Sequence, residues 1–203
     1  MNKYFYRSQD IIFEMMERRG NAISKENKFS IEDFEDMLKN NNDLTIHNDD
    51  TLISWKLCID AQYLKQIFQL ILKNNITTWI IIHSKKIAPI TIQRINEIQN
   101  CFIQIFNVNE LQVNIIKNNL IPRHVLLTNK EEEQLLKEYN IKKNQLPFIL
   151  SADKIVKYYG WKKGRIIKIY RDKTDDMNTT DNIDRTDDNI IDNIIDMTYR
   201  VIV

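Results

Sequence analysis

The first part of the chain begins with two helical hydrophobic patterns. Apolar residues recur at helical spacing over residues 4–19, and Gly20 follows where a glycine commonly ends a helix. A second helix is predicted over residues 30–38. Its first turn can be capped by Ser30, and the Asp33 carboxylate suits the positive end of the helix dipole. Two helices should therefore precede the first strand.

Strands and helices alternate in the next segment. Residues 44–47 and 52–58 are predicted strands joined by a hairpin turn. A helix capped by Asp60 is expected to follow, up to about residue 74. The apolar face of this helix is predicted to contain Leu64, Ile67, Phe68, Ile71 and Leu72.

Two apolar runs further along predict strands inside a sheet. The β-branched run at 77–83 suits a strand buried on both faces, and residues 101–106 are expected to form another buried strand. Pro89 can open a helix between them, because its fixed φ and missing N–H are harmless in a first turn. This order of elements implies right-handed crossovers and a partly parallel sheet.

A new pattern begins near residue 120. Short strands are predicted at 125–128, 165–171 and 198–203, with two helices between the first two strands. Thr128 and Glu131 have the spacing of a capping box for the first helix.

The second of these helices is short. Ser151 or Asp153 can cap its start, and Gly160 can end it. Residues 145–149, which precede it, are expected to be extended.

Charge is distributed unevenly along the chain. Residues 172–197 hold nine acidic and two basic residues, a net charge of −7, whereas the whole chain carries +1 at pH 7. The remainder therefore carries +8, which suits work near nucleic acid or acidic partners and equally an ordinary solvated surface. We expect the acidic segment to be a loop inserted in the final hairpin, with a short amphipathic helix at 189–197.

Composition argues against several kinds of enzyme site. Three glycines cannot form the glycine-rich loops that cradle phosphates, and no G-x-S-x-G motif occurs. The chain's histidines and cysteines are scattered singly, without the spacing of metal ligands (His47, His83, His124, Cys58 and Cys101). The two cysteines lie in apolar runs and are expected to be reduced. We therefore predict no catalytic residue, metal or cofactor.

A metal-dependent nuclease is one enzyme that a mixed sheet flanked by helices can host. Such a site needs an acidic residue on one strand and an acid-x-Lys pair on the next. The best candidate is Ser54-Trp55-Lys56, with Asp49 and Asp50 upstream. Because Ser54 stands where an acid is needed, a plain strand is the preferred interpretation.

More specific sequence marks begin at Leu120. They are Leu120-Ile-Pro-Arg-His-Val, Leu135-Leu-x-x-Tyr-Asn-Ile-x-x-Asn-Gln-Leu-Pro147, Val156-x-Tyr-Tyr-Gly160-x-Lys-x-Gly164 and the final Thr198-Tyr-Arg-Val. This stretch resembles the assembly domain of the fifth subunit shared by eukaryotic RNA polymerases I, II and III. In archaeal RNA polymerase the same domain stands alone as a small separate subunit. Weaker marks upstream, Arg18-Arg19-Gly20 and Ala88-Pro89 among them, resemble the jaw domain of the eukaryotic subunit.

Together the patterns and the resemblance predict an α/β and α+β protein. An N-terminal jaw domain (1–118), a mixed sheet flanked by helices, would precede a small two-layer α+β assembly domain (119–203) with the acidic insertion 172–197. The resemblance implies a non-catalytic polymerase subunit that docks on the largest subunit and forms part of the jaw near downstream DNA.

The resemblance also implies roles for individual residues. Candidate partner contacts are His124, Arg165, Lys168, Arg171 and Arg200. Positions of the structural motif are Pro122, Thr128, Glu131, Gln145, Pro147, Gly160 and Gly164. Candidate DNA-proximal residues are Arg18, Arg19, Lys85, Lys86 and Pro89. The four cations among them would attract phosphates without reading bases.

Two further expectations concern partners and location. A free adaptor that binds transcription regulators through the jaw and the acidic segment is the alternative function. The subunit would work in the nucleus of a cell, or in the virion and host cytoplasm if this divergent, Ile- and Asn-rich copy comes from a large DNA virus. No apolar run is long enough to predict a membrane span, and no secretory signal is predicted.

Overall fold

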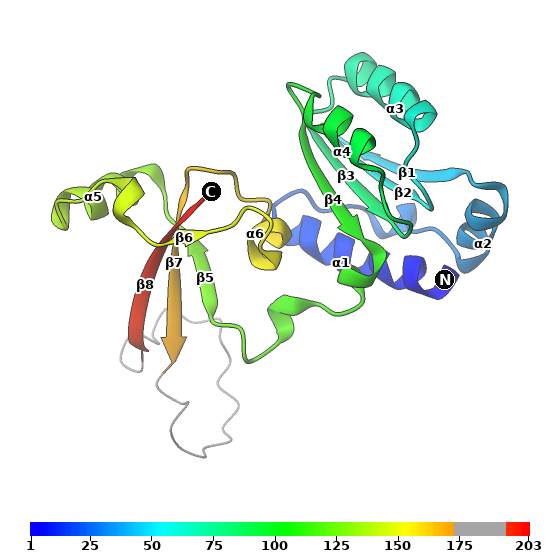
Figure 1. The fold of residues 1–203 in the computed structure, drawn as a ribbon. Coiled ribbons are helices and arrows are strands. Elements are labelled where there is room, and N and C mark those ends of the chain that lie inside the picture. The colour runs from blue at the N-terminus through cyan, green and yellow to red at the C-terminus, as the bar shows by residue number, and fades with distance from the viewer. Residues whose placement is uncertain (173–193) are drawn as a thin grey trace. The chain divides into compact units, whose positions relative to one another are not determined.

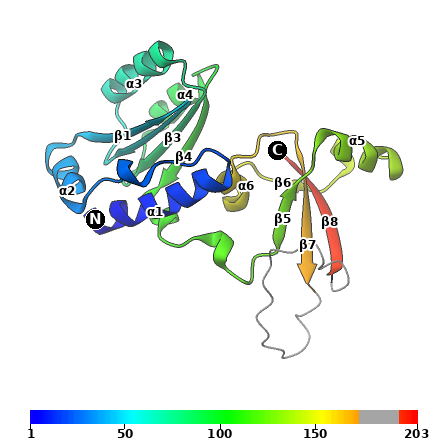
Figure 2. The ribbon, with the colours of Figure 1, turned by 180° about the vertical axis from the view of Figure 1, so that it is seen from behind.

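The computed structural model describes residues 1–172 and 194–203. The chain divides into two compact units, Met1–Asn114 and Ile115–Val203. Each unit contains one four-stranded mixed sheet with helices (Figures 1 and 2), which confirms the predicted α/β and α+β class. Among the described helices, none combines the length and the apolar character needed to cross a membrane.

The N-terminal unit is built around a partly parallel sheet, as predicted. Its strand order is β1-β2-β3-β4, with β1 antiparallel to β2 and with β2, β3 and β4 parallel. The elements are α1 (Asn2–Arg18), η1 (Lys25–Asn27), α2 (Ile31–Asn40), β1 (Asp43–Asn48), β2 (Thr51–Lys56), α3 (Ala61–Asn74), β3 (Thr78–His83), α4 (Pro89–Asn96), β4 (Phe102–Asn107) and η2 (Val108–Leu111).

Helices cover both faces of this sheet (Figure 1). On the side of α1 and α2, the Trp55 ring meets Phe34 edge-on at 6.3 Å, and its Nε1 donates to the Ser8 hydroxyl at 3.0 Å. On the side of α3 and α4, Trp79 and Ile81 belong to the cluster that these two helices bury. The predicted buried strand β3 therefore lies between two apolar layers.

Local polar groups fix the helix ends where the sequence predicts them. Ser30 and Asp33 form a reciprocal capping box at the start of α2. Asp60 accepts a hydrogen bond from the Tyr63 amide at 2.8 Å and so caps α3. Gly20 follows α1 at a φ of +85°, a backbone conformation that favours glycine.

Burial in this unit differs from the sequence patterns in two places. Phe68 and Leu72 are 41% and 63% exposed, because the buried stripe of α3 is centred instead on Tyr63, Leu64, Ile67 and Ile71. The strand predicted at 101–106 is only half-buried, because β4 lies at the edge of the sheet.

The C-terminal unit contains a smaller sheet in the order β5-β7-β8-β6. In this sheet β6 is parallel to β8, and the other neighbours are antiparallel. The elements are η3 (Ile115–Lys117), β5 (Arg123–Leu126), α5 (Asn129–Glu138), η4 (Lys143–Gln145), β6 (Phe148–Ile149), α6 (Lys154–Tyr159), β7 (Ile166–Asp172) and β8 (Ile194–Ile202).

Two separate hydrophobic clusters lie on opposite faces of this sheet. Ile166 packs with Leu135 of α5, whereas the next residue, Ile167, packs with Val156 of α6. Successive side chains of a strand point to opposite faces. Ile166 and Ile167 are both fully buried, so each face of β7 is covered at this point. We call these two faces the α5 face and the α6 face.

The acidic segment is shorter than predicted. Residues 194–197 belong to β8, where the Tyr170 and Arg171 positions of β7 pair with Met197 and Asp196. The helix predicted at 189–197 is therefore wrong over 194–197, because pairing with β7 satisfies the backbone there. Its remaining residues lie outside the part of the chain that the structure describes.

Candidate interaction surface of the C-terminal unit

The motif positions of this unit have defined local roles. Thr128 and Glu131 close the predicted capping box, in which the Thr128 amide donates to the Glu131 carboxylate at 2.6 Å. Gly160 ends α6 at a φ of +68°, and Gly164 adopts a φ of +80° in the turn before β7. The carbonyl of Pro147 accepts from the Val201 amide at 2.9 Å. These positions shape the fold, which leaves other residues to make contacts.

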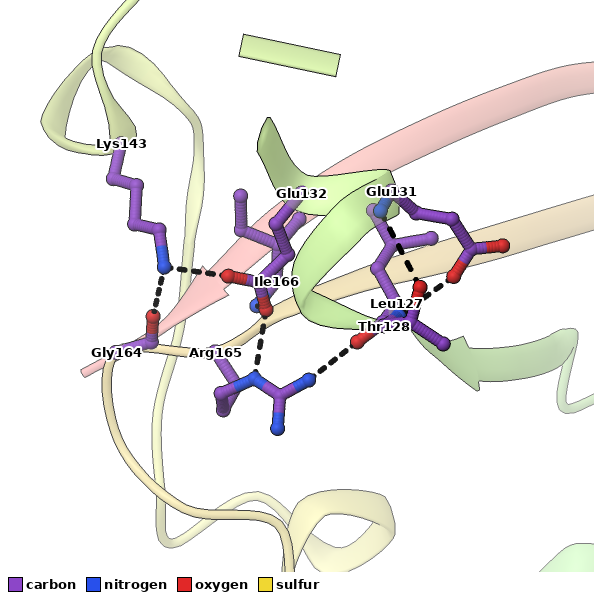
Figure 3. Close-up of polar contacts among 8 residues, drawn as sticks. All are labelled: Leu127, Thr128, Glu131, Glu132, Lys143, Gly164, Arg165 and Ile166. Atoms are coloured by element: carbon purple, nitrogen blue, oxygen red, sulfur yellow. Dashed lines mark hydrogen bonds and ion pairs between the residues drawn. The ribbon is translucent and has the colours of Figure 1, made fainter. Parts of the chain in front are cut away.

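Sequence reasoning missed the buried carboxylate of Glu132, which accepts three hydrogen bonds (Figure 3). Glu132 is 4% exposed. Its Oε1 accepts from Arg165 Nε at 2.8 Å and from the Ile166 amide at 3.0 Å, and its Oε2 accepts from Lys143 Nζ at 2.5 Å. The carboxylate therefore joins α5 to η4 and to the start of β7.

Each of the two cations in this network also donates a hydrogen bond to a backbone carbonyl. Arg165 also donates to the Leu127 carbonyl, and Lys143 Nζ donates to the Gly164 carbonyl at 2.9 Å. Burial would raise the pKa of Glu132, but the hydrogen bonds from Lys143, Arg165 and Ile166 outweigh it and hold that pKa below its ordinary value. The network is thus built around a charged carboxylate.

A local signal could have found Glu132. It stands in the run Glu131-Glu132-Glu133, which resembles a solvated helix face. Glu132 nevertheless lies three residues before the buried Leu135, so the two side chains share one side of α5. What the sequence does not give is the distant partner, Arg165, because that contact depends on how α5 packs on β7.

Strand register separates the five candidate partner contacts. His124 pairs with Ile169, and Arg200 pairs with Ile167, so both side chains lie on the α6 face. Arg171 follows the same alternation along β7 and lies on this face too. Lys168 lies on the opposite, α5 face, and Arg165 is held in the Glu132 network. The structure therefore brings three of the five candidates to one face.

His124 presents a defined acceptor on this α6 face. Its Nδ1 donates to the Pro122 carbonyl at 2.7 Å, since a carbonyl can only accept, so in the neutral ring Nε2 is the acceptor. Burial lowers the pKa of His124, and the charge of Arg200 lowers it further, while the Pro122 carbonyl and Asp153 act in the opposite sense. The ring is thus neutral near pH 7.

The structure does not bring the DNA-proximal candidates of the N-terminal unit together. α1 ends near the β1–β2 turn, where the Asn48 side-chain amide donates to the Asn21 carbonyl at 3.4 Å. This turn lies beside the N-terminal ends of the parallel strands, whereas β3 ends at the opposite side of the sheet. One end of the sheet therefore carries Arg18 and Arg19, and the other carries Lys85, Lys86 and Pro89.

The residues of the nuclease alternative are engaged elsewhere. Lys56 is 7% exposed, and its Nζ donates to the Asn41 carbonyl rather than facing solvent. The Asp50 carboxylate accepts from the Thr77 hydroxyl. Within residues 1–172 and 194–203, no group of three His, Cys, Asp or Glu side chains could hold a metal ion. Cys58 and Cys101 are free and half-buried, as predicted.

Comparison with known proteins identifies a matching family and several relatives. Residues 113–180 match the family described as RNA polymerase Rpb5, C-terminal domain. The chain is 34% identical over 109 residues to DNA-directed RNA polymerases IV and V subunit 5B of Arabidopsis thaliana, covering 53% of this chain and 50% of that protein.

Other relatives carry similar names. Subunit rpabc1 of DNA-directed RNA polymerases I, II, and III from Dictyostelium discoideum is 38% identical over 95 residues, 45% of this chain and 48% of that protein. The RPABC1 subunit of Caenorhabditis elegans is 33% identical over 139 residues, 64% of this chain and 66% of that protein. The chain spans about half the length of the first two relatives. These findings confirm the resemblance that the sequence marks indicate, and the C-terminal unit belongs to the family of the RNA polymerase Rpb5 C-terminal domain.

Proposed function

We propose that this chain is a non-catalytic structural subunit of a multisubunit DNA-directed RNA polymerase. The observation that carries the proposal is the family match over residues 113–180, together with relatives that are each named as polymerase subunits. The geometry is in keeping with a structural role, because the polar residues of the C-terminal unit cap helices and join strands. In this role the chain contributes contacts and shape rather than a reaction.

Attachment to the largest polymerase subunit is the first part of the proposal. We infer that it uses the α6 face, where His124, Arg171 and Arg200 lie together. Arginine is enriched among residues that dominate binding energy at protein interfaces. An oriented neutral imidazole adds an acceptor of fixed direction beside these cations. Arg165 is left out of this surface, because both Glu132 and the Leu127 carbonyl bind it.

The second part concerns the N-terminal unit, which we place as the jaw near downstream DNA. Its two basic groups lie at opposite ends of one sheet, so they would touch separate stretches of phosphate backbone. Such contacts attract DNA without reading sequence, and they weaken as salt rises. Transcription regulators are further partners in this proposal, and the nucleus is its location in a cell.

Native co-purification tests the proposal. A tagged full-length chain, expressed in its own source cells or infected cells, should bring down the large subunits of an RNA polymerase in mass spectrometry. The tag alone should bring down none. Recovery of the tagged chain by itself, at low and at physiological salt, would contradict the proposal.

A further inference from the structure

A second surface of the C-terminal unit lies on the α5 face of the sheet. Arg123 pairs with Tyr170 across β5 and β7, and Lys168 pairs with Tyr199 across β7 and β8. Met197 pairs with Tyr170 on the other side. Cross-strand partners point to the same face, so these five side chains form one group, here called the aromatic-basic platform.

The platform lies beyond the part of the face that α5 covers. The α5 cluster is centred on Ile166 and Val201, and Tyr199 borders it. From there β5, β7 and β8 run on past both helices of the unit (Figures 1 and 2). Arg123 is exposed and Met197 is 50% exposed, while the other three side chains are half-buried. The platform is therefore a partly accessible region of the sheet.

Cations and aromatic rings alternate on the platform. Lys168 Nζ lies 4.8 Å from the centre of the Tyr170 ring and 6.0 Å from that of Tyr199. The Arg123 guanidinium carbon lies 5.7 Å from the centre of the Tyr170 ring. Such cation–π contacts orient the charges without neutralising them.

Carboxylates of the described residues do not neutralise these charges. Neither Arg123 nor Lys168 forms an ion pair within residues 1–172 and 194–203. Glu131 is near enough for the charge of Lys168 to lower its pKa, after the larger effects of its hydrogen bonds with Thr128. That carboxylate already accepts the Thr128 amide of the capping box. Among the described residues, two positive charges therefore remain for an anionic ligand.

The combination points to one class of ligand. Single-stranded nucleic acid binds where bases stack on aromatic side chains and phosphates meet cations, often on the open face of a small sheet. The two tyrosines lie on β7 and β8, the central strands of a four-stranded sheet. An acidic peptide would use the cations but leave the rings without a role, and a duplex would offer no free base faces.

We propose that the aromatic-basic platform of Arg123, Lys168, Tyr170, Met197 and Tyr199 binds single-stranded nucleic acid. The inference goes beyond the proposed function and does not rest on it, since it follows from the residues of one sheet face. RNA and DNA single strands share the chemistry that the platform recognises.

Fluorescence anisotropy with the full-length chain tests this inference. The probes are labelled twelve-nucleotide oligo-U and oligo-dT, whose relative affinities show whether RNA or DNA is preferred. Tyr170→Ala should raise Kd about tenfold through lost stacking, whereas Tyr170→Phe should bind as wild type does. Arg123→Ala should raise Kd several-fold and reduce the slope of log K against log salt by about 0.7.

Lys163→Ala is the matched control, because it removes one exposed cation in the turn before β7, away from the platform. Its Kd should stay within about twofold of wild type. Thermal melts show whether each variant is folded. If Tyr170→Ala unfolds, Arg123→Ala still tests the platform, because Arg123 is exposed and its loss should leave the fold intact. The inference is overturned by absence of saturable binding, by equal loss in Lys163→Ala, or by an oligo-glutamate peptide binding where oligonucleotides do not.

Discussion

The N-terminal unit packs around fully buried aromatic rings, whereas the C-terminal unit combines clusters of aliphatic side chains with one buried carboxylate that two cations hold. In the first, Trp55 and Trp79 are fully buried on opposite faces of one sheet, and each Nε1 donates to a serine of the core. In the second, a buried carboxylate joins α5, η4 and β7 through three hydrogen bonds. The two units thus differ in what specifies their packing.

The match to a family model lies mainly over the C-terminal unit. An apolar core tolerates many exchanges of similar volume, so it leaves few specific marks in a sequence. Glycines at positive φ and a buried charged pair, such as Gly160, Gly164 and Glu132 with Arg165, each admit few residue types. The family match accordingly begins at residue 113, beside the division between the units at Asn114 and Ile115.

Removing a large ring from the N-terminal core should give the largest effect. Trp55→Ala should cost about 4 kcal/mol of unfolding free energy, because it leaves a cavity beside Phe34. It also takes away the donor to Ser8. Hydrogen exchange measured peptide by peptide at several denaturant concentrations gives the unfolding free energy of this unit separately from that of the other. Trp55→Phe should cost less than half as much, and a cost below about 1 kcal/mol for Trp55→Ala contradicts the account.

Two adjacent glutamates sharpen the comparison within the C-terminal unit. Glu132→Ala should cost about 3 kcal/mol, because Arg165, Lys143 and the Ile166 amide lose their shared acceptor. The exposed neighbour Glu131→Ala removes half of the capping box and should cost clearly less than Glu132→Ala. Denaturant unfolding of the two variants gives the ranking. Equal costs would show that the buried network adds nothing beyond an ordinary cap.

Acid should lower the unfolding free energy of the C-terminal unit in two separate pH ranges. The folded-state pKa of His124 lies below its ordinary 6.5, so protons favour the unfolded chain as pH falls below that value. The folded-state pKa of Glu132 lies below its ordinary 4.5, so its contribution is lost as pH falls further, below 4.5. Unfolding curves from pH 7.5 to 3.5 should show both steps, and His124→Gln should lack the first. Constant stability between pH 7.5 and 5.5 would contradict the role given to His124.

The smallest effect is expected on the exposed side of α3. Leu72 is 63% exposed, so Leu72→Lys should change the unfolding free energy by less than about 0.5 kcal/mol. Its neighbour Ile71 is 5% exposed, and Ile71→Ala should cost about 3 kcal/mol. Thermal melts of the two variants should show a large loss of stability for Ile71→Ala and almost none for Leu72→Lys. A large cost for Leu72→Lys would mean that this residue is buried after all.

Local features could be predicted from the sequence, and contacts between distant residues could not. Ser30, Asp60 and Thr128 cap helices within three residues of themselves, so their roles follow from spacing alone. The exposure of Phe68 depends on how α3 lies on the sheet. The helical period shows which residues share the apolar side of the helix, but it does not show which edge of that side stays in solvent. The start of β8 depends on pairing with β7, and a short run of isoleucines fits a helix or a strand equally well.

The residues of the candidate surface show the same contrast between what the sequence predicts and what depends on distant contacts. The resemblance implies partner contacts for His124, Lys168 and Arg200, yet strand register decides that Lys168 faces away from the other two. The role of Arg165 could not be assigned from its sequence, because the buried carboxylate that holds it lies 33 residues earlier.

Attachment of the chain through the α6 face is the central claim, and a pair of charge reversals on β7 tests it most directly. Arg171→Glu and Lys168→Glu make the same change three residues apart on opposite faces of the strand. In native purification of tagged, full-length variants, Arg171→Glu should lose most of the polymerase subunits, and Lys168→Glu should retain them. Retention of the polymerase by Arg171→Glu, together with its loss from Lys168→Glu, would contradict the account and place the docking surface on the α5 face.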